Sequence, residues 1–134
     1  MKKVAIYRGC FNPIGKHHID IANQLCEYFD EVYVTPQYAF NDKTLYPSHR
    51  LKMCQIAVNN NNNKSVRVCD FEINSKWEGT YRGIFETFCD YLQRDNNKLY
   101  MVIGENKIIS MDTNRDINGI PECLPIITIP REGY

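Results

Sequence analysis

Short apolar runs alternate with segments of helical periodicity along most of the chain. The apolar runs span four or five residues and are rich in Val, Ile and Tyr, which predicts buried strands. These runs lie at residues 4–7, 31–35, 66–70, 99–103 and 125–129. Because strands that alternate with helices form βαβ units, the pattern predicts an α/β fold with a five-stranded parallel sheet.

Three of the intervening segments repeat apolar residues at helical spacing, which predicts amphipathic helices at 16–29, 47–58 and 80–92. Ser48 is the expected N-cap of the second helix, and short helical turns are expected within 105–122. Helices on both faces of the sheet would make a Rossmann-like, three-layer α/β/α architecture. With 134 residues and no linker or repeat, the sequence predicts a single domain over 1–134.

Composition excludes several classes of function. Sixteen basic side chains balance sixteen acidic ones, so a protein that coats nucleic acid or an anionic membrane is not expected. No apolar run reaches about 18 residues, and the start of the chain lacks the apolar core of a signal peptide. We therefore expect a cytoplasmic protein without a membrane partner or a nucleic-acid partner.

The six cysteines do not form a metal-binding pattern, because no two of them lie within four residues of each other. Most stand inside apolar stretches and are interpreted as small buried hydrophobic residues. Only Cys10 differs, because it lies in a loop with polar neighbours. The sequence therefore predicts no metal site built from protein ligands.

The loop that joins the first strand to the first helix carries the most promising chemistry. Gly9 permits close approach of the backbone to a ligand, and the first helical turn presents unpaired N–H groups that favour an anion. Lys16, His17 and His18 lie at the same helix end, where the helix dipole disfavours cations. Their presence there favours a phosphate ligand. The alternative, a solvent-facing Lys16 beside a packed and neutral His18, stays open.

Two features place the chain near a known family. Gly9-Cys10-Phe11-Asn12-Pro13, followed by His18, resembles the nucleotidyltransferase signature Gly-x-Phe-Asp/Asn-Pro-x-His/Thr-x-Gly-His. Further segments resemble, in the same order, those of nicotinate mononucleotide adenylyltransferases. They lie at residues 47–58, 70–73, 79–81, 86–88, 102–106 and 124–134.

The resemblance implies transfer of the adenylyl group of ATP to nicotinate or nicotinamide mononucleotide, with release of pyrophosphate and with Mg²⁺ accompanying ATP. It implies that His18 donates to the phosphates, assisted by Lys16 and His17. The implied nucleotide-binding residues are Gly9, Cys10, Phe11, Asn12, Gly104, Asn106 and Arg131. The implied contacts to the mononucleotide are Thr80 and Tyr81.

The chain departs from the family pattern at the helix start. Gly15 replaces the first signature histidine and His17 replaces the following glycine, so His-x-Gly-His becomes Gly-Lys-His-His. The printed sequence also stops before the family's Ile-Ser-Ser-Thr-x-x-Arg segment. Two other functions therefore stay open: a non-catalytic nucleotide-binding module of the same fold, and another adenylyl- or cytidylyltransferase such as a pantetheine-phosphate adenylyltransferase.

Other basic side chains are weaker candidates for phosphate binding. Arg131 follows the last predicted strand and is equally compatible with phosphate contact and with exposure to solvent. Lys43 and Arg50 are expected to be solvated surface residues. The pattern leaves the oligomeric state open, including a homo-oligomer.

Overall fold

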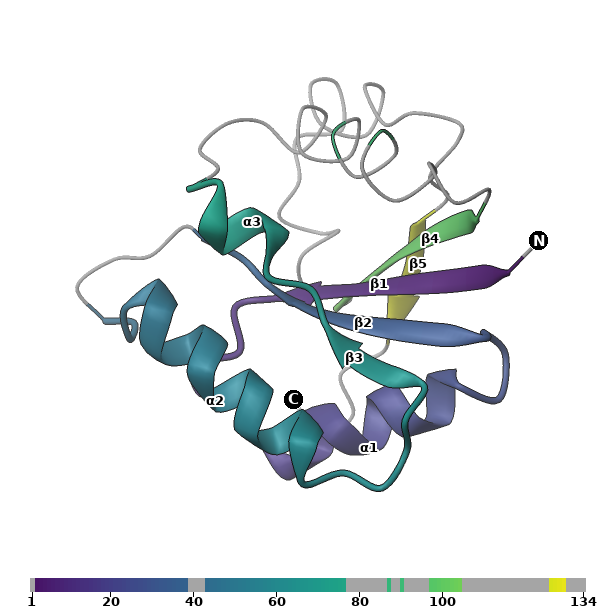
Figure 1. The fold of residues 1–134 in the computed structure, drawn as a ribbon, viewed down its shortest axis with the longest axis horizontal. Coiled ribbons are helices and arrows are strands. Elements are labelled where there is room, and N and C mark those ends of the chain that lie inside the picture. Colours follow the sequence, from purple (N-terminus) through teal and green to yellow (C-terminus); the bar gives the residue numbers. More distant parts are fainter. Residues whose placement is uncertain are drawn as a thin grey trace.

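The computed structural model describes residues 2–38, 43–76, 87, 90, 97–104 and 126–129. Within these residues, five strands form one sheet in the order β3-β2-β1-β4-β5 (Figure 1), and every neighbouring pair is parallel. The strands are β1 (Lys3–Gly9), β2 (Glu31–Pro36), β3 (Val66–Val68), β4 (Lys98–Gly104) and β5 (Ile126–Ile129). The prediction of an α/β fold with a parallel sheet is confirmed.

Strand β1 lies in the middle of the sheet and is buried on both faces. Val4, Ala5 and Ile6 have no exposed surface, as expected for the central strand of a parallel sheet. The chain adds β2 and β3 on one side of β1 and then adds β4 and β5 on the other side. This change of direction creates a topological switch point between β1 and β4, where ligands bind in open α/β sheets.

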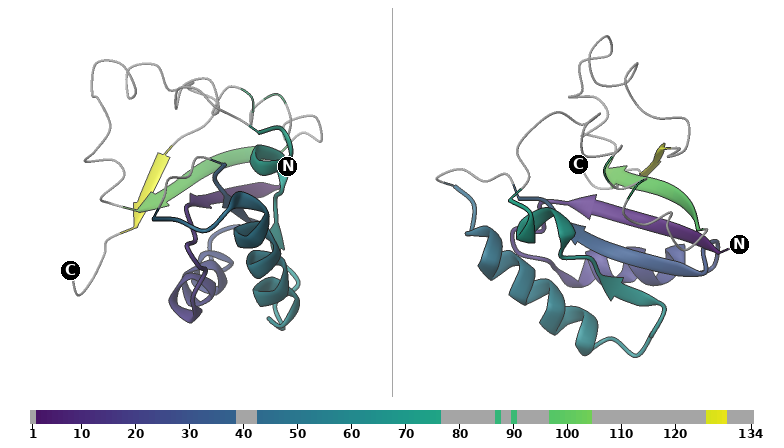
Figure 2. Two further views of the ribbon diagram at one scale, coloured as in Figure 1. Left: turned by 90° about the vertical axis from the view of Figure 1, so that its left-hand side faces the viewer. Right: turned by 45° about the horizontal axis from the view of Figure 1, so that its top comes forward.

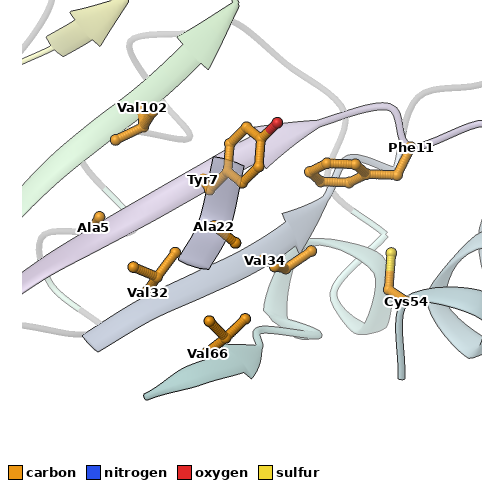
Figure 3. Packing of buried hydrophobic residues seen from close by; sticks show 9 residues of the cluster. All are labelled: Ala5, Tyr7, Phe11, Ala22, Val32, Val34, Cys54, Val66 and Val102. Carbon is orange, nitrogen blue, oxygen red and sulfur yellow. The ribbon is translucent and has the colours of Figure 1, made fainter. Parts of the chain in front are cut away.

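Two helices, α1 (Lys16–Leu25) and α2 (Pro47–Asn59), cover the same face of the sheet (Figures 1 and 2). Between the helices and the sheet lies a hydrophobic cluster drawn in Figure 3. It consists of Ala5, Tyr7, Phe11, Ala22, Val32, Val34, Cys54, Val66 and Val102. Burial of these apolar side chains holds α1 and α2 against the strands whose carboxyl ends form the switch point.

The opposite face is described only in part. A short helix, α3 (Phe71–Asn74), lies on that side in Figure 1 and contacts β2. Of the helix predicted at 80–92, the structure describes only Thr87 and Asp90, both helical. The turns predicted within 105–122 lie outside the described residues. The three-layer arrangement therefore stays a prediction.

The first helix ends earlier than the sequence predicts. Regular α-helix stops at Leu25 rather than near Phe29, because Cys26 and Glu27 donate their N–H groups three residues back, to Asn23 and Gln24. Such bonds tighten the last turn into 3₁₀ geometry. Phe29 nevertheless packs against the hydrophobic cluster, so its predicted inward direction is correct.

The second helix begins at Pro47, as the predicted range has it, but its N-cap differs from the expected one. Tyr46, not Ser48, is the N-cap, and Pro47 occupies the first helical position. Proline is favoured there because its fixed φ suits a helix start, and it holds the preceding residue in an extended conformation. Ser48 is therefore inside the first turn, and the prediction that it caps the helix is wrong.

Strand β3 is also shorter than predicted, and the sequence analysis missed α3 entirely. The ladder ends at Val68, and Asp70 becomes the N-cap of α3 instead of a strand residue. Cys69 still donates its N–H to the carbonyl of Val34, so the chain leaves the sheet within two residues. A four-residue helix is too short for periodicity to reveal it.

The described cysteines are free thiols. Cys54 and Cys69 are buried, and burial raises the pKa of Cys54 to about 12 and that of Cys69 to about 11. Cys10 and Cys26 are half-buried. Cys89 and Cys123 lie outside the described residues. The interpretation of Cys54 and Cys69 as small core residues is therefore confirmed.

Candidate active site

The loop between β1 and α1 lies at the switch point of the sheet. Gly9 ends β1 and Lys16 begins α1, so residues 10–15 cross the carboxyl edge of the central strand. Tyr7 pairs with Val102, and both strands continue for two more residues, to Gly9 and Gly104. The carboxyl ends of β1 and β4, at Gly9 and Gly104, therefore lie at one edge of the sheet.

Phe11 anchors this loop in the hydrophobic core. Its backbone has a φ of 49°, in the left-handed region, and its side chain is only 4 % exposed. The ring meets the rings of Tyr7 and His18 edge to face, at centroid distances of 5.3 and 5.1 Å. The side chain of Phe11 therefore packs inside the protein, so the predicted nucleotide contact could involve only its backbone.

Gly9 provides the space that this packing needs. A Cβ atom at position 9 would lie 3.3 Å from Cζ of Phe11, which is tighter than ordinary van der Waals contact. A side chain at position 9 would require the ring of Phe11 to shift. Glycine at position 9 thus serves the packing of the loop, in addition to any approach by a ligand.

Asn12 connects the loop to the segment that precedes α2. Its Oδ1 accepts a hydrogen bond from the N–H of Leu45 at 2.7 Å, and its Nδ2 donates to the carbonyl of Lys43 at 3.4 Å. The side chain of Lys43 is exposed, as expected. The structure thus gives Asn12 a structural contact that the sequence did not reveal, and its role toward a nucleotide stays a prediction.

His18 lies in the first turn of α1 with its ring orientation fixed. Its Nδ1 accepts a hydrogen bond from the backbone N–H of Gly15, the N-cap residue, at 2.9 Å. A neutral imidazole that accepts at Nδ1 carries its proton on Nε2. His18 is half-buried rather than sealed in the core, so Nε2–H is suited to donate to an anion at the helix start.

The same turn concentrates positive charge and donors. Lys16 and His17 are exposed, and the ring of His17 lies over that of His18, with centroids 3.8 Å apart and planes tilted by 39°. The first turn of α1 contains no acidic side chain. The start of a helix, a lysine and two imidazoles together favour an anionic ligand with several oxygen atoms. The three residues predicted at the centre of the site are therefore brought together.

Arg50 is the main correction to the sequence analysis. Expected at the solvated surface, it has no exposed area and donates to main-chain carbonyls of three segments. Nη1 reaches Cys10 at 2.7 Å and Gln37 at 2.8 Å, Nε reaches Leu45 at 3.0 Å, and Nη2 reaches Tyr38 at 3.3 Å.

The geometry of the guanidinium explains this burial. Its five N–H donors in a planar fork can satisfy several carbonyls that leave regular structure at nearby points. Arg50 of α2 therefore holds together the loops that follow β1 and β2 and the segment before α2. The sequence does show an arginine within a predicted helix and two polar loops elsewhere in the chain. The helical pattern does not reveal which loop carbonyls lie within reach of that arginine.

A buried ion pair, also missed, supports the other side of β1. Glu72 of α3 accepts from Nε and Nη2 of Arg8, at 2.7 and 3.0 Å, and from the N–H of Tyr38 at 2.8 Å. The side chains of Arg8 and Glu72 are 9 % and 1 % exposed. A fork-to-carboxylate contact of this kind compensates the burial of both charges. It joins the carboxyl end of β1 to α3.

Four predicted site residues lie outside the described part of the chain: Thr80, Tyr81, Asn106 and Arg131. Their proximity to the β1–α1 loop is therefore untested. Within the described residues, no three His, Cys, Asp or Glu side chains are grouped so that they could hold a metal ion. None of the helices described there is both long enough and apolar enough to cross a membrane.

The chain is similar in sequence to known proteins. The sequence profile of a family described as cytidylyltransferase-like matches residues 6–132. The chain is 28 % identical over 142 residues to a probable nicotinate-nucleotide adenylyltransferase of Staphylococcus epidermidis, covering 98 % of this chain and 70 % of that protein. It is 31 % identical over 139 residues to a probable nicotinate-nucleotide adenylyltransferase of Bacteroides fragilis, covering 98 % and 67 %.

The fold also matches a solved structure. Nicotinic acid mononucleotide adenylyltransferase of Plasmodium falciparum, complexed with NaAD, superposes with a TM-score of 0.69 at 20 % sequence identity. The match covers 100 % of this chain and 77 % of that one. At this identity the likeness is evidence for the Rossmann-like fold alone.

Proposed function

The chain belongs to the cytidylyltransferase-like family, and from this premise we propose that it transfers the adenylyl group of ATP to nicotinate or nicotinamide mononucleotide. The choice of acceptor is supported by the two probable nicotinate-nucleotide adenylyltransferases that align with nearly the whole chain. The match to the fold of a protein complexed with NaAD is consistent with it.

The proposed reaction needs little acid–base chemistry. An oxygen of the mononucleotide's 5′-phosphate forms a bond to the α-phosphorus of ATP, and the bond from that phosphorus to the oxygen bridging to the β-phosphorus breaks. Pyrophosphate leaves with the bonding electron pair. Because the nucleophile is already an anion, catalysis depends on positioning the phosphates and stabilising their charge.

The observation that carries the proposal is the orientation of His18. The Gly15–Nδ1 hydrogen bond leaves the ring proton on Nε2, at a helix start without acidic neighbours in its first turn. We propose that Nε2–H donates to the phosphates of ATP, together with the N–H groups of α1 and the ammonium group of Lys16. These donors stabilise the negative charge that develops on the leaving pyrophosphate.

We propose that the remaining site residues also contact the two nucleotides. Backbone groups of Gly9, Cys10 and Phe11 line the space between the two nucleotides, with Asn12 and Gly104 beside them. The resemblance to the family adds Asn106 and Arg131 on the ATP side, and Thr80 and Tyr81 near the mononucleotide.

Magnesium is proposed to enter with ATP as part of the substrate. The groups gathered at the start of α1 are hydrogen-bond donors and cations, which suit phosphate oxygens rather than a bare metal ion. Mg²⁺ commonly keeps several water ligands and binds through substrate phosphates. The ion would then neutralise phosphate charge while Lys16 and His18 orient the phosphates.

The direct test is pyrophosphate release from MgATP in the presence of nicotinate mononucleotide, nicotinamide mononucleotide or 4′-phosphopantetheine. We expect turnover with a pyridine mononucleotide, and we expect His18→Ala to reduce kcat about 100-fold or more. The control is His49→Ala, which removes the one histidine outside the 15–18 segment and should leave turnover unchanged. Thermal melting of each variant corrects for any loss of folded protein.

The remaining outcomes separate the alternatives. Turnover with phosphopantetheine alone would move the protein to another branch of the family. Binding of ATP by calorimetry without pyrophosphate release from any acceptor would contradict the enzymatic proposal and favour a non-catalytic nucleotide-binding module.

A further inference from the structure

Gly15 is not required by its backbone conformation. Its φ of −118° and ψ of 175° are extended values that any residue adopts. What distinguishes the position is space: a Cβ atom there would lie 3.0 Å from Nδ1 and 3.1 Å from Cε1 of His17. These distances are shorter than ordinary contacts, so a side chain at position 15 and the ring of His17 compete for the same volume.

The ring of His17 is also held beside the ring proposed to bind phosphate. Its centroid lies 3.8 Å from that of His18, while the residue as a whole is exposed. Neither imidazole has a carboxylate in the first turn of the helix, and Lys16 adds a third basic group. The ammonium group of Lys16 and the positive end of the helix dipole both favour an anion beside these two rings.

We propose that His17 is a second phosphate-binding residue of this site, with its imidazole taking the space vacated by the absent side chain at position 15. This inference rests on the proposed binding of ATP at the start of α1. Relative to the family signature, histidine and glycine have exchanged places between positions 15 and 17. The helix start therefore keeps two imidazoles, one from His17 and one from His18. His17 donates an N–H to a phosphate oxygen while its ring face lies against His18.

A purely structural role for His17 makes a different prediction. If the ring only supports His18 by stacking, another aromatic ring should replace it. If its N–H binds phosphate, an aromatic ring without a donor should not. His17→Phe keeps the ring and removes the donor, so it distinguishes the two roles.

Restoring the family order of the motif provides the complementary test. The double variant Gly15→His/His17→Gly replaces Gly-Lys-His-His with His-Lys-Gly-His. It removes the imidazole at position 17 and supplies one at position 15, where the glycine at 17 leaves room for it. If an imidazole at position 15 can replace the one at position 17, the double variant should bind ATP when His17→Gly alone does not.

The experiment uses two assays for each variant: calorimetry gives the Kd of MgATP, and pyrophosphate release gives kcat and KM. We expect His17→Phe and His17→Gly to raise the Kd and KM of ATP roughly 10- to 100-fold, while the KM of the mononucleotide changes less than threefold. The double variant should return both ATP constants to within about threefold of wild type. His49→Ala should match wild type in both assays.

The results separate this inference from the proposed function. Wild-type affinity for ATP in His17→Phe would overturn the role of His17, and failure of the double variant to recover ATP affinity would do the same. Loss of ATP binding in His17→Phe and its recovery in the double variant would support that role even if no acceptor is turned over, an outcome that contradicts only the enzymatic proposal. If wild-type protein neither binds MgATP nor releases pyrophosphate, both proposals fail.

Discussion

At Arg50 a single guanidinium group replaces water as the partner of carbonyls from three segments. The carbonyl of Cys10 belongs to the proposed phosphate-binding loop, whereas those of Gln37 and Leu45 lie after β2 and before α2. Because the arginine is fully buried and these bonds are partly buried, its loss removes a donor that water replaces only in part. Arg50 is therefore a positioning residue for the loop that it does not itself belong to.

Replacing Arg50 by methionine should lower the free energy of unfolding by about 3 kcal/mol, because four partly buried carbonyls lose a donor. Arg50→Lys should fall between methionine and wild type, since a lysine keeps the charge but not the planar fork. Denaturant unfolding measures both variants. The matched control is Lys52→Met, an exposed change on the same helix, which should stay within about 0.5 kcal/mol of wild type.

If Arg50→Met is as stable as Lys52→Met, the hydrogen bonds of Arg50 do not stabilise the fold as proposed. The kinetic consequence is separate: among variants that still fold, Arg50→Lys should raise the KM of ATP, because the backbone at Cys10 is less firmly held.

At the scale of elements, the ion pair of Arg8 and Glu72 joins β1 to α3 on one face, while Phe11 packs the following loop against the other. These contacts hold the end of β1 from both sides of the sheet. A rigid carboxyl end of the central strand is what a binding loop needs, because small displacements there change the distances to phosphate oxygens.

A double-mutant cycle tests the ion pair. Glu72→Gln, which leaves Arg8 buried without a full counter-charge, should cost about 3–5 kcal/mol of stability. Arg8→Met combined with Glu72→Gln should cost less than the sum of the single changes. The same cycle on Lys2 and Glu31, a pair whose lysine side chain is 64 % exposed, should give a coupling below about 1 kcal/mol. Additive effects at Arg8 and Glu72 would show that the two charges do not stabilise each other.

The sequence predicts what repeats locally and misses what depends on distant partners. Strand positions, the parallel order and the grouping of Lys16, His17 and His18 follow from apolar runs and from one loop. The burial of Arg50 depends on carbonyls up to 40 residues away, and that of Glu72 on an arginine 64 residues away. Neither distance leaves a periodic trace in the chain. Ser48 failed as a cap for a different reason, since the neighbouring Pro47 determines the helix start.

At the scale of the whole molecule, acidic groups buried as neutral species link stability to alkaline pH. Burial raises the pKa of Tyr7 from 10.0 to about 12 and that of Cys54 from 9.0 to about 12. Both belong to the cluster between the sheet and the helices. Because the folded state disfavours their anions, their contribution to stability is complete below pH 9 and is lost as the pH rises toward 12.

We therefore expect the contribution of Tyr7 and Cys54 to the free energy of unfolding, measured in urea, to be nearly constant from pH 7 to 8.5. It should fall between pH 9 and 11. Cys54→Ala should lower stability at pH 7 through the lost side-chain volume, and should make the decline above pH 9 less steep because one titrating thiol is gone. An unchanged slope in Cys54→Ala would contradict the assignment of that thiol to the alkaline transition.

The proposed function depends on where the phosphates of ATP bind. The most direct measurement is a crystal structure of the protein with a non-hydrolysable ATP analogue and Mg²⁺. We expect a phosphate oxygen about 2.7–2.9 Å from Nε2 of His18 at the start of α1, with Nδ1 still accepting from Gly15. A nucleotide bound away from the β1–α1 loop, or phosphates beyond hydrogen-bond distance of His18, would contradict the account.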